Sequence, residues 1–366
     1  MKNIDIFREM ENGGFEQVIF NYDKTTGLKA IIAIHDTTLG PALGGCRMWP
    51  YEDEEHALID ALRLARGMTY KCAVSDANFG GGKTVIIGDP KKDKNEGLFR
   101  ALGRYVQSLN GRYYTGTDVG TYGDDFVYAA RETGYLVGLP EEYGGSGNSA
   151  VPTAYGVYLG MKAAAKTVYG DESLKGLSVA IQGVGKVGAL LVDDLVKDGA
   201  ELTICDICEE NVKKVQAKYP DIKVVGCDEI FGVECDIFSP CALGGVLNDE
   251  TIPLLKCKII AGSANNQLLE ERHGDLLHER GILYAPDFVV NAGGLIQVAD
   301  ELEMHGTSKA RVMKKTEAIY NILLKIFAVS KEKNIPTYKV ADILAEERIN
   351  TIGRIKVNYS TFPATK

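Results

Sequence analysis

The fold class of this chain can be read first from residues 177–206, which run LSVAIQGVGKVGALLVDDLVKDGAELTICD. An apolar run leads into Gly183, Gly185 and Gly188, which have the spacing G-x-G-x-x-G, and a helical pattern follows them. A second apolar run ends in Asp206, 23 residues beyond Gly183. This order and spacing are typical of a strand, a tight turn, a helix and a second strand that together bind a dinucleotide.

Each part of this unit has an expected role in binding a nucleotide. The glycines allow a tight turn and a close approach of the backbone to a pyrophosphate, and the helix N-terminus offers N–H groups to the phosphates. Asp206 would accept hydrogen bonds from both ribose hydroxyls and would repel a 2'-phosphate, which favours NAD over NADP as the cofactor. The expected contacts are Gly183, Val184, Gly185, Lys186, Val187, Gly188, Asp206 and Ile207.

The rest of the chain predicts two α/β domains. From Leu177 onward, short apolar runs alternate with helical patterns, as in a doubly wound parallel sheet of the Rossmann type. The stretch GGSGNSAVP at 144–152 is rich in Gly, Ser and Pro and predicts a linker. We therefore expect a substrate-binding and oligomerisation domain at 1–145 plus 333–366, separated by a cleft from an NAD-binding domain at 146–332.

Periodicity predicts the elements of the first domain in outline. Two β-branched runs joined by the turn KTTG predict a hairpin of Val18–Tyr22 with Leu28–His35. Apolar residues at helical spacing predict a helix over Glu54–Tyr70, and a strand is expected at Thr84–Ile87. A last helix, expected over Tyr338–Arg354, would return to this domain.

Composition and charge exclude several classes of partner. Of the 366 residues, 41 are Lys or Arg and 50 are Asp or Glu, so the net charge is -9, and no basic cluster indicates a nucleic acid or an anionic membrane as partner. The first residues lack the apolar core of a signal peptide, and no apolar run is long enough to span a membrane. Eight scattered cysteines fit reduced thiols, so we expect a cytoplasmic protein. We expect no metal site, and we place His273 and His278 on the surface of a polar helix.

Four glycine-marked segments precede the nucleotide-binding unit and each ends near a polar residue. They are GPALGGCR (40–47), GMTYK (67–71), GGGK (80–83) and TGTDVGT (115–121). A single lysine is usually a solvated surface residue, and Asp118 alone could be a turn-forming cap. However, Lys71, Lys83 and Asp118 all stand beside glycines or semi-buried backbone. Two lysines and an acid near a nicotinamide would suit hydride transfer from an anionic substrate that carries an amine or a hydroxyl.

These segments closely resemble those of the amino-acid dehydrogenases of the glutamate/leucine/phenylalanine/valine superfamily. The resemblance runs along nearly the whole chain and includes IIAIHDTTLGPALGG, RGMTYK, GGGKTVIIGDP, CDIFSPCALGG, GSANNQL and APDFVVNAGG. It implies an NAD-dependent oxidoreductase that carries out the reversible oxidative deamination of an L-amino acid to a 2-oxo acid and ammonia. It also implies a homo-oligomer, usually an octamer or a hexamer, in amino-acid metabolism.

The resemblance implies a role for each matching residue. Lys71 and the backbone N–H groups of Gly44 and Gly45 would hold the substrate carboxylate. Lys83 would be the general base that activates water, and Asp118 would relay protons to and from the substrate nitrogen. The implied substrate-binding residues are Leu43, Gly44, Gly45, Met68, Lys71, Gly116, Asn266, Asn291, Leu295 and Val298. The further implied cofactor contacts are Thr153, Cys241, Ala242, Ala264, Asn265, Asn266 and Asn291.

Departures from the superfamily pattern indicate an apolar substrate side chain. Glutamate dehydrogenases carry a lysine where this chain has Leu43 and a serine where it has Val298, and a carboxylate without those partners would be buried unpaired. Phenylalanine dehydrogenases resemble this chain at Gly116-Thr117-Asp118 and at Leu295, where leucine dehydrogenases typically have AED and valine. The stretches MWPY and MKAAAKTVYG lean toward the leucine enzymes instead.

We favour L-phenylalanine as the substrate, with leucine dehydrogenase activity on branched-chain substrates as the alternative. One methyl group of pocket volume changes discrimination by only about 1–3 kcal/mol, so both substrates could be turned over. An NAD(H)-sensing protein that has lost its chemistry is a further alternative, because a fold alone does not prove catalysis. A hydroxy-acid dehydrogenase would need a histidine–carboxylate pair, and none of the five histidines lies in a glycine-marked segment.

Overall fold

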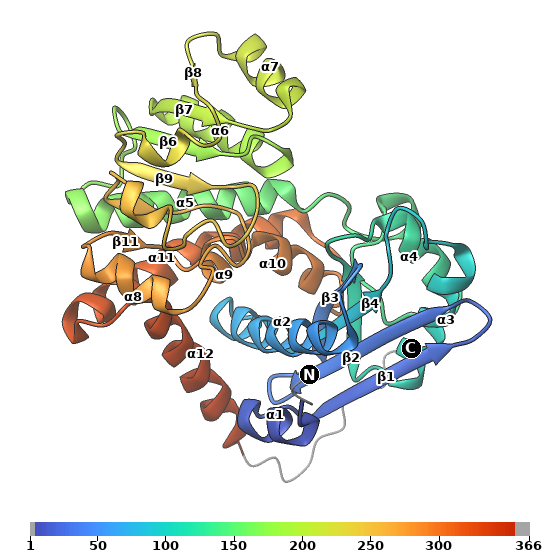
Figure 1. Cartoon of the computed structure of the whole chain (residues 1–366). Helices are drawn as coiled ribbons and strands as arrows, with labels where there is room; N and C mark the ends of the chain where they lie inside the picture. The colour runs from blue at the N-terminus through green and yellow to red at the C-terminus, as the bar shows by residue number, and fades with distance from the viewer. Residues whose placement is uncertain (1–3, 356–366) are drawn as a thin grey trace. The chain divides into compact units, whose positions relative to one another are not determined.

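The computed structural model describes residues 4–355 and divides into two compact units (Figure 1). Among the described residues, the first unit comprises 4–135 with 343–355, and the second comprises 136–342. The second unit therefore holds ten more residues at each end than the sequence led us to expect. Residues 356–366, which we expected in the first domain, lie outside the described part of the chain. Each unit contains its own β-sheet, so the expected α/β fold class is confirmed.

The first unit is built on a mixed five-stranded sheet. Its strand order is β1-β2-β4-β3-β5, and β2 pairs antiparallel with both β1 and β4, whereas β3 pairs parallel with β4 and β5. The expected hairpin is confirmed as β1 and β2. The strands are β1 (Gln17–Asp23), β2 (Leu28–Asp36), β3 (Ala42–Trp49), β4 (Gly80–Ile87) and β5 (Tyr113–Thr117).

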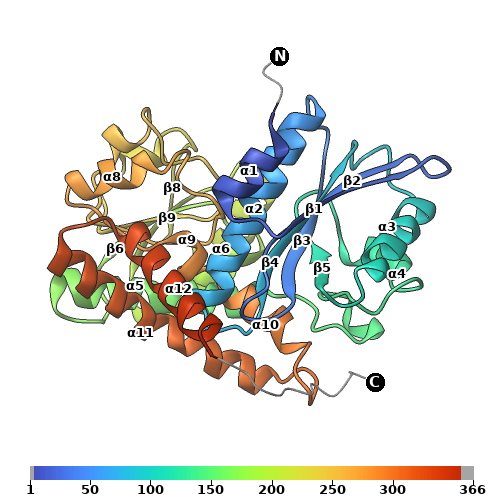
Figure 2. The same cartoon turned by 90° about the horizontal axis from the view of Figure 1, so that it is seen from below.

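Helices cover both faces of this sheet, and Figure 2 shows α2 and α3 on opposite sides of it. The apolar stripe of α2 packs on β2 and β4, where it forms a core cluster. This packing follows from the helical spacing of its apolar residues. The cluster contains Ala57, Leu58, Ala61, Leu62 and Ala65 of α2 with Ile31, Ala33 and Val85 of the sheet. The helices are α1 (Ile6–Gly13), α2 (Glu54–Val74), α3 (Glu96–Ser108) and α4 (Gly123–Ala129).

Strand β3 and the first half of β4 were not expected, because glycine is depleted in strands. Here the glycines are needed for close contact between backbones. A Cβ on Gly44 would lie 1.8 Å from the carbonyl oxygen of Gly82 on β4, and one on Gly45 would lie 2.7 Å from that of Thr117. The assigned residue pairs between β3 and β4 also skip Gly44 and Gly45. The glycine clusters of segments 40–47 and 80–83 are therefore a signature of tightly packed strands.

The second unit is a doubly wound parallel sheet, as expected. Its strand order is β11-β10-β9-β6-β7-β8, and every pair is parallel. The order reverses between β6 and β9, and ligands of such sheets bind outside the carboxyl ends of the strands at this point. The strands are β6 (Ser178–Gln182), β7 (Glu201–Cys205), β8 (Lys223–Val224), β9 (Ile237–Pro240), β10 (Ile259–Ile260) and β11 (Leu283–Tyr284).

The helices of the second unit pack around this sheet, with α5 in contact with α6, α10 and α11. The last helix, α12, crosses the boundary between the units. Its Tyr338 belongs to a core cluster of the second unit, whereas Arg348 donates hydrogen bonds to the carbonyl oxygens of Ala73 and Ala77 in the first. The helices are α5 (Ala150–Tyr169), α6 (Lys186–Asp198), α7 (Glu209–Lys218), α8 (Arg272–Glu279), α9 (Asp287–Val290), α10 (Gly293–Asp300), α11 (Lys309–Lys333) and α12 (Thr337–Gly353).

The Gly- and Ser-rich segment that we interpreted as a linker is bonded to α10. The backbone N–H groups of Gly138 and Ser146 both donate to the carboxylate of Glu301, each at 2.9 Å. The side-chain amide of Gln297 donates to the carbonyl oxygen of Ser146, also at 2.9 Å. These bonds place the segment within the second unit.

The expectation that His273 lies on the surface is wrong. His273 is fully buried on the inner side of α8, next to Leu277, and its Nδ1 accepts a hydrogen bond from the backbone N–H of Glu270. The helix is polar in composition, but it turns this side toward the core. A spacing of five residues does place His273 and His278 on different parts of the helix surface, and His278 is half-buried.

Changing Gly81 on β4 or Gly67 on α2 to alanine should have opposite effects on stability, because only Gly81 is tightly packed. A Cβ on Gly81 would lie 2.2 Å from the backbone nitrogen of Thr69 and 2.4 Å from the carbonyl oxygen of Ala65. Gly81→Ala should therefore destabilise the protein by about 1–3 kcal/mol. Gly67→Ala, which meets nothing within 4 Å on α2, should stabilise it by up to about 1 kcal/mol. Urea unfolding measures both, and equal midpoints for the two variants would contradict the packing argument.

Candidate active site

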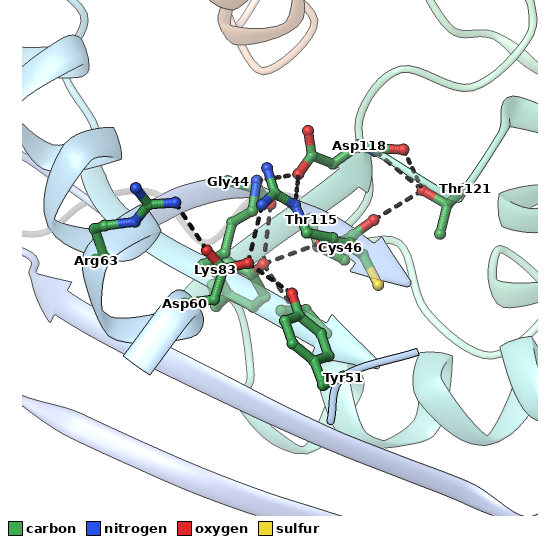
Figure 3. A network of polar contacts seen from close by, with 12 residues as sticks. Gly44, Cys46, Tyr51, Asp60, Arg63, Lys83, Thr115, Asp118 and Thr121 are labelled. Atoms are coloured by element: carbon green, nitrogen blue, oxygen red, sulfur yellow. Dashed lines mark hydrogen bonds and ion pairs between the residues drawn. The ribbon is translucent and has the colours of Figure 1, made fainter. Parts of the chain in front are cut away.

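Lys83 lies in the middle of β4, a central strand of the first sheet, and its side chain is only 6% exposed. The glycines before it allow the strand to run close to its neighbours. A Cβ on Gly82 would lie 2.8 Å from the ring of Tyr113 on β5. The Lys83 ammonium lies 2.7 Å from Oδ2 of Asp118 (Figure 3). A buried amine and a carboxylate are thus in direct contact, which is the arrangement needed to move a proton between them.

Asp118 directly follows β5, and the turn that carries it is fixed to β3. The backbone N–H of Asp118 donates to the hydroxyl of Thr121, and that hydroxyl donates to the carbonyl oxygen of Cys46 at 2.8 Å. The backbone N–H of Met48 donates to the carbonyl oxygen of Val119. These bonds, part of which Figure 3 shows, hold the carboxylate of Asp118 in one place.

The charge of Asp118 is stabilised by two cations. Burial by itself raises the pKa of a carboxyl group, but the positive charges of Lys83 and Arg47 outweigh burial here and lower the pKa of Asp118 to about 2. Lys83 and the Nε of Arg47 both contact Oδ2, at 2.7 and 3.1 Å. Asp118 is therefore ionised at neutral pH.

Sequence reasoning missed Arg47, although it ends the segment GPALGGCR. The guanidinium of Arg47 bridges Asp118 and Asp60, and its Nη1 donates to Oδ2 of Asp60 at 2.9 Å. The hydroxyl of Tyr51 donates to the same oxygen of Asp60 at 2.6 Å. Burial raises the pKa of Asp60, but the bond from Tyr51 and the charge of Arg47 give a net lowering. Only the folded chain brings these residues together, because α2 carries Asp60 and β3 carries Arg47.

The structure places the expected carboxylate-binding residues on two neighbouring elements. Gly44 and Gly45 lie on β3, and Cγ of Met68 on α2 would lie 3.3 Å from a Cβ on Gly44. Lys71 lies in the last turn of α2 and is half-buried. Gly116 on β5 is the assigned cross-strand partner of Gly45. A Cβ on Gly45 would also lie 2.9 Å from Cβ of Asp118, so Gly45 and Asp118 are direct neighbours.

The expected nucleotide turn has the geometry that a pyrophosphate requires. Gly183 has φ +95°, in the region that favours glycine, and a Cβ on Gly188 would lie 2.1 Å from the carbonyl oxygen of Gly183. A Cβ on Gly185 would meet nothing within 4 Å, so the backbone there faces open space. Gly185 is also the N-cap of α6, which has no side-chain cap, and the N-terminal N–H groups of a helix bind anions. These residues fit a dinucleotide.

Asp206 stands at the end of β7, beside this turn. Its carboxylate accepts hydrogen bonds from the backbone N–H groups of Val184 and Cys208, each at 2.8 Å. The bond to Val184 ties the acid to the glycine turn. The side-chain amide of Asn211 also donates to Oδ2, at 3.4 Å. A carboxylate has about four acceptor positions, so about one remains for a ribose hydroxyl.

Two further expected cofactor residues follow β9 and lie against the glycine turn. The backbone N–H of Cys241 donates to the carbonyl oxygen of Gln182 at 2.7 Å, and a Cβ on Gly183 would lie 2.8 Å from Cβ of Ala242. Strands β6 and β9 are neighbours at the reversal of strand order, so their carboxyl ends lie side by side where ligands of such sheets bind. Lys186 and Val187 lie within the glycine turn, between Gly185 and Gly188, and Ile207, which is exposed, directly follows Asp206.

The remaining expected residues of the second unit lie in the loop after Ala264, at the end of α9, and on α5 and α10. The side-chain amide of Asn291 donates to Oδ1 of Asn265 at 2.8 Å, and Asn266 has φ +52° in the loop after Ala264. Thr153 lies on α5 next to α10, since a Cβ on Gly294 would lie 3.0 Å from its hydroxyl. On α10 itself, Leu295 is buried and Val298 is half-buried.

The described residues contain neither a metal-binding cluster nor a helix that could span a membrane. Within residues 4–355, no group of three or more His, Cys, Asp or Glu side chains is arranged to hold a metal ion. No helix in this part of the chain is long and apolar enough to cross a membrane.

Comparisons with known proteins agree on one family. The family model of the Glu/Leu/Phe/Val dehydrogenase dimerisation domain matches residues 16–137, and that of glutamate/leucine/phenylalanine/valine dehydrogenase matches residues 201–354. Leucine dehydrogenase of Geobacillus stearothermophilus is 58% identical over 353 residues, which cover 96% of this chain and 95% of that protein. Phenylalanine dehydrogenase of Thermoactinomyces intermedius is 56% identical over 353 residues, which cover 96% of each.

A solved structure supports the same conclusion. The crystal structure of L-tryptophan dehydrogenase from Nostoc punctiforme matches with a TM-score of 0.83 and 46% identity, and it covers 95% of this chain and 100% of that one. The relatives thus differ in the substrates that their names give, although each is at least 46% identical to this chain. The chain belongs to the glutamate/leucine/phenylalanine/valine dehydrogenase family, whose leucine and phenylalanine enzymes are amino-acid dehydrogenases that use NAD.

Proposed function

We propose that this amino-acid dehydrogenase acts on apolar L-amino acids and prefers L-phenylalanine, which it converts reversibly to phenylpyruvate and ammonia. The main support for catalysis is the buried contact of 2.7 Å between Lys83 and Asp118. A protein that only senses NAD(H) would have no use for a buried lysine–carboxylate pair outside its nucleotide site, and burying two charges is costly.

In the proposed mechanism, Lys83 and Asp118 divide the proton transfers between oxygen and nitrogen. Bound NAD supplies the hydride acceptor for the carbon that is oxidised. Lys83 takes a proton from the water that attacks the imino carbon and then supports the resulting hydroxyl. Asp118 relays this proton from Lys83 to the nitrogen. The C–N bond breaks as the neutral Lys83 takes the proton of the hydroxyl, and the 2-oxo acid and ammonia form. In the reverse direction, the reaction begins with Lys83 protonated, as it is in the ion pair with Asp118.

The substrate carboxylate needs a cation and N–H donors near this pair. We assign it to Lys71 and to the backbone of Gly44 and Gly45, as the family resemblance implies. Gly45 supports this assignment because it is a direct neighbour of Asp118. An α-carboxylate at this position would bring the amino group of the same substrate within reach of Asp118.

The preference for an apolar side chain rests on Leu43, Gly116, Leu295 and Val298. Leu43 lies beside Gly44 and is 1% exposed, so a charged substrate group there would lack a partner. Gly116 has no side chain, which leaves more room than the alanine typical of leucine dehydrogenases. Leucine is the second candidate substrate, and the 58% identity to a leucine dehydrogenase favours it.

We also propose that the chain forms a homo-oligomer through its first unit. The family model that matches residues 16–137 is described as a dimerisation domain. Strand β1 is an edge of the five-stranded sheet, and its Phe20 and Tyr22 side chains are 54% and 61% exposed. Exposed edges with large apolar side chains favour association. Sedimentation velocity that gives only a monomer at micromolar concentration would contradict this proposal.

The proposed base predicts the behaviour of Lys83→Ala. Loss of general base catalysis should lower kcat for amino-acid oxidation by about 100-fold to 10,000-fold. NADH binding, measured by fluorescence, should change less than about twofold, because Lys83 lies outside the nucleotide-binding unit. Lys92→Ala is the control, since the Lys92 side chain is 80% exposed and forms an ion pair with Asp89. Near-normal turnover of Lys83→Ala would remove Lys83 from the mechanism.

The proposed specificity predicts the order of substrates. In initial-rate assays of NADH formation, kcat/KM should be higher for L-phenylalanine than for L-leucine and L-valine, and lowest for L-glutamate. Gly116→Ala should lower the ratio of phenylalanine to leucine activity by about tenfold, because one methyl group is worth about 1–3 kcal/mol. Gly134→Ala, where a Cβ meets nothing within 4 Å, should leave the ratio unchanged. A wild-type preference for leucine would keep the mechanism but reject the aromatic pocket.

A further inference from the structure

The Asp118 carboxylate is held at one oxygen by two cations that differ in chemistry. Lys83 and Arg47 both contact Oδ2, at 2.7 and 3.1 Å. Figure 3 shows the other oxygen, Oδ1, on the side away from these contacts. Lysine can lose its proton in a working active site, whereas the arginine guanidinium stays charged at every pH at which proteins function.

Arg47 is itself held in place from its far side. Its Nη1 donates to Oδ2 of Asp60, and Asp60 also accepts hydrogen bonds from Tyr51 at Oδ2 and from Arg63 at Oδ1. The side chains of Arg47 and Asp60 are 18% and 13% exposed. A guanidinium fork that bridges two carboxylates in this way has little freedom to turn away from Asp118.

We propose that Arg47 is a positioning residue of the reaction: anchored by Asp60, it fixes Oδ2 of Asp118, keeps this carboxylate ionised when Lys83 is neutral, and leaves Oδ1 for the substrate nitrogen. This role rests on the proposed function, in which Lys83 gives up and regains a proton in each cycle. When Lys83 is neutral, Asp118 has lost one of its two cations. The fixed charge of Arg47 then prevents Asp118 from taking a proton at the wrong step.

The other titratable groups around the carboxylate do not take over this role. On β3 and β5, Cys46 and Tyr113 are fully buried, and burial raises the pKa of each, so both are neutral at working pH. On α2, Asp60 is an acid that is already paired with Arg47. Among the side chains that the structure describes in contact with Asp118, the cations are therefore Lys83 and Arg47.

The proposal is tested with Arg47→Met, which keeps an apolar stem and removes the charge, and with Arg47→Lys, which restores a charge without the bridging fork. Without the fixed charge, the Lys83–Asp118 pair should hold its proton more tightly. In Arg47→Met, the rising limb of kcat/KM for amino-acid oxidation should therefore move to higher pH by about one unit or more. Its kcat should fall about 10-fold to 100-fold at neutral pH, while KM and NADH binding change less than about threefold.

Two variants separate this role from a purely structural one. Arg47→Lys should bring the limb back toward its wild-type pH but recover kcat only in part. Arg63→Met removes a charge that also binds Asp60 but does not touch Asp118, so its profile should match the wild type. A limb that stays at the wild-type pH in Arg47→Met, or that Arg47→Lys does not restore, would overturn the proposal.

A direct titration keeps the test independent of turnover. If the wild type turns over no amino acid, the proposed function fails. The effect of Arg47 is then tested on the pKa of the Asp118 carboxyl group alone. In protein labelled with ¹³C at aspartate side chains, the Asp118 signal is assigned by its loss in Asp118→Asn. Its midpoint should rise by one unit or more in Arg47→Met and stay unchanged in Arg63→Met. Equal midpoints in Arg47→Met and the wild type would overturn the inference.

Discussion

A carboxylate taken out of water must be neutralised or paired, and the site in the first unit is organised around this requirement at Asp118. Lys83 and Arg47 meet its Oδ2, and the pKa of Asp118 falls to about 2 despite burial. Because both cations are themselves largely buried, each depends on the acid as the acid depends on them. Arg47 is in turn paired with Asp60 on α2, and Asp60 accepts a hydrogen bond from Tyr51, which lies just after β3.

Close backbone packing makes this charge arrangement possible. Gly44, Gly45 and Gly82 allow β3, β4 and β5 to approach so closely that a methyl group at any of them would clash. The side chains that remain on these strands, Lys83 among them, are thereby brought within contact distance of the turn that carries Asp118. The glycines of these segments therefore allow the strands to pack closely, and this packing brings Lys83 into contact with Asp118.

Glycines have a different role in the second unit, where they shape the turn between β6 and α6. At Gly183 and Gly188, missing side chains allow the turn to close and the helix to pack on the strand, while Gly185 leaves its backbone facing open space. Asp206 is tied to this turn through the N–H of Val184, so that the acid expected to bind the ribose is fixed relative to the N–H groups expected to bind the phosphates. The parallel sheet contributes the reversal of strand order that opens the site between β6 and β9.

Local pattern determined the doubly wound sheet, the dinucleotide turn and the β1–β2 hairpin, because periodicity and glycine spacing are properties of neighbouring residues. The candidate roles of Lys83 and Asp118 came from the resemblance of their segments to the family. Tertiary structure decided the rest. It made a strand of the glycine-rich segment 42–49, bonded the supposed linker to α10, and turned His273 into the core. It also brought Arg47 between Asp60 and Asp118, residues 13 and 71 positions away. Such contacts depend on which strands and helices become neighbours, and a single sequence does not carry that information locally.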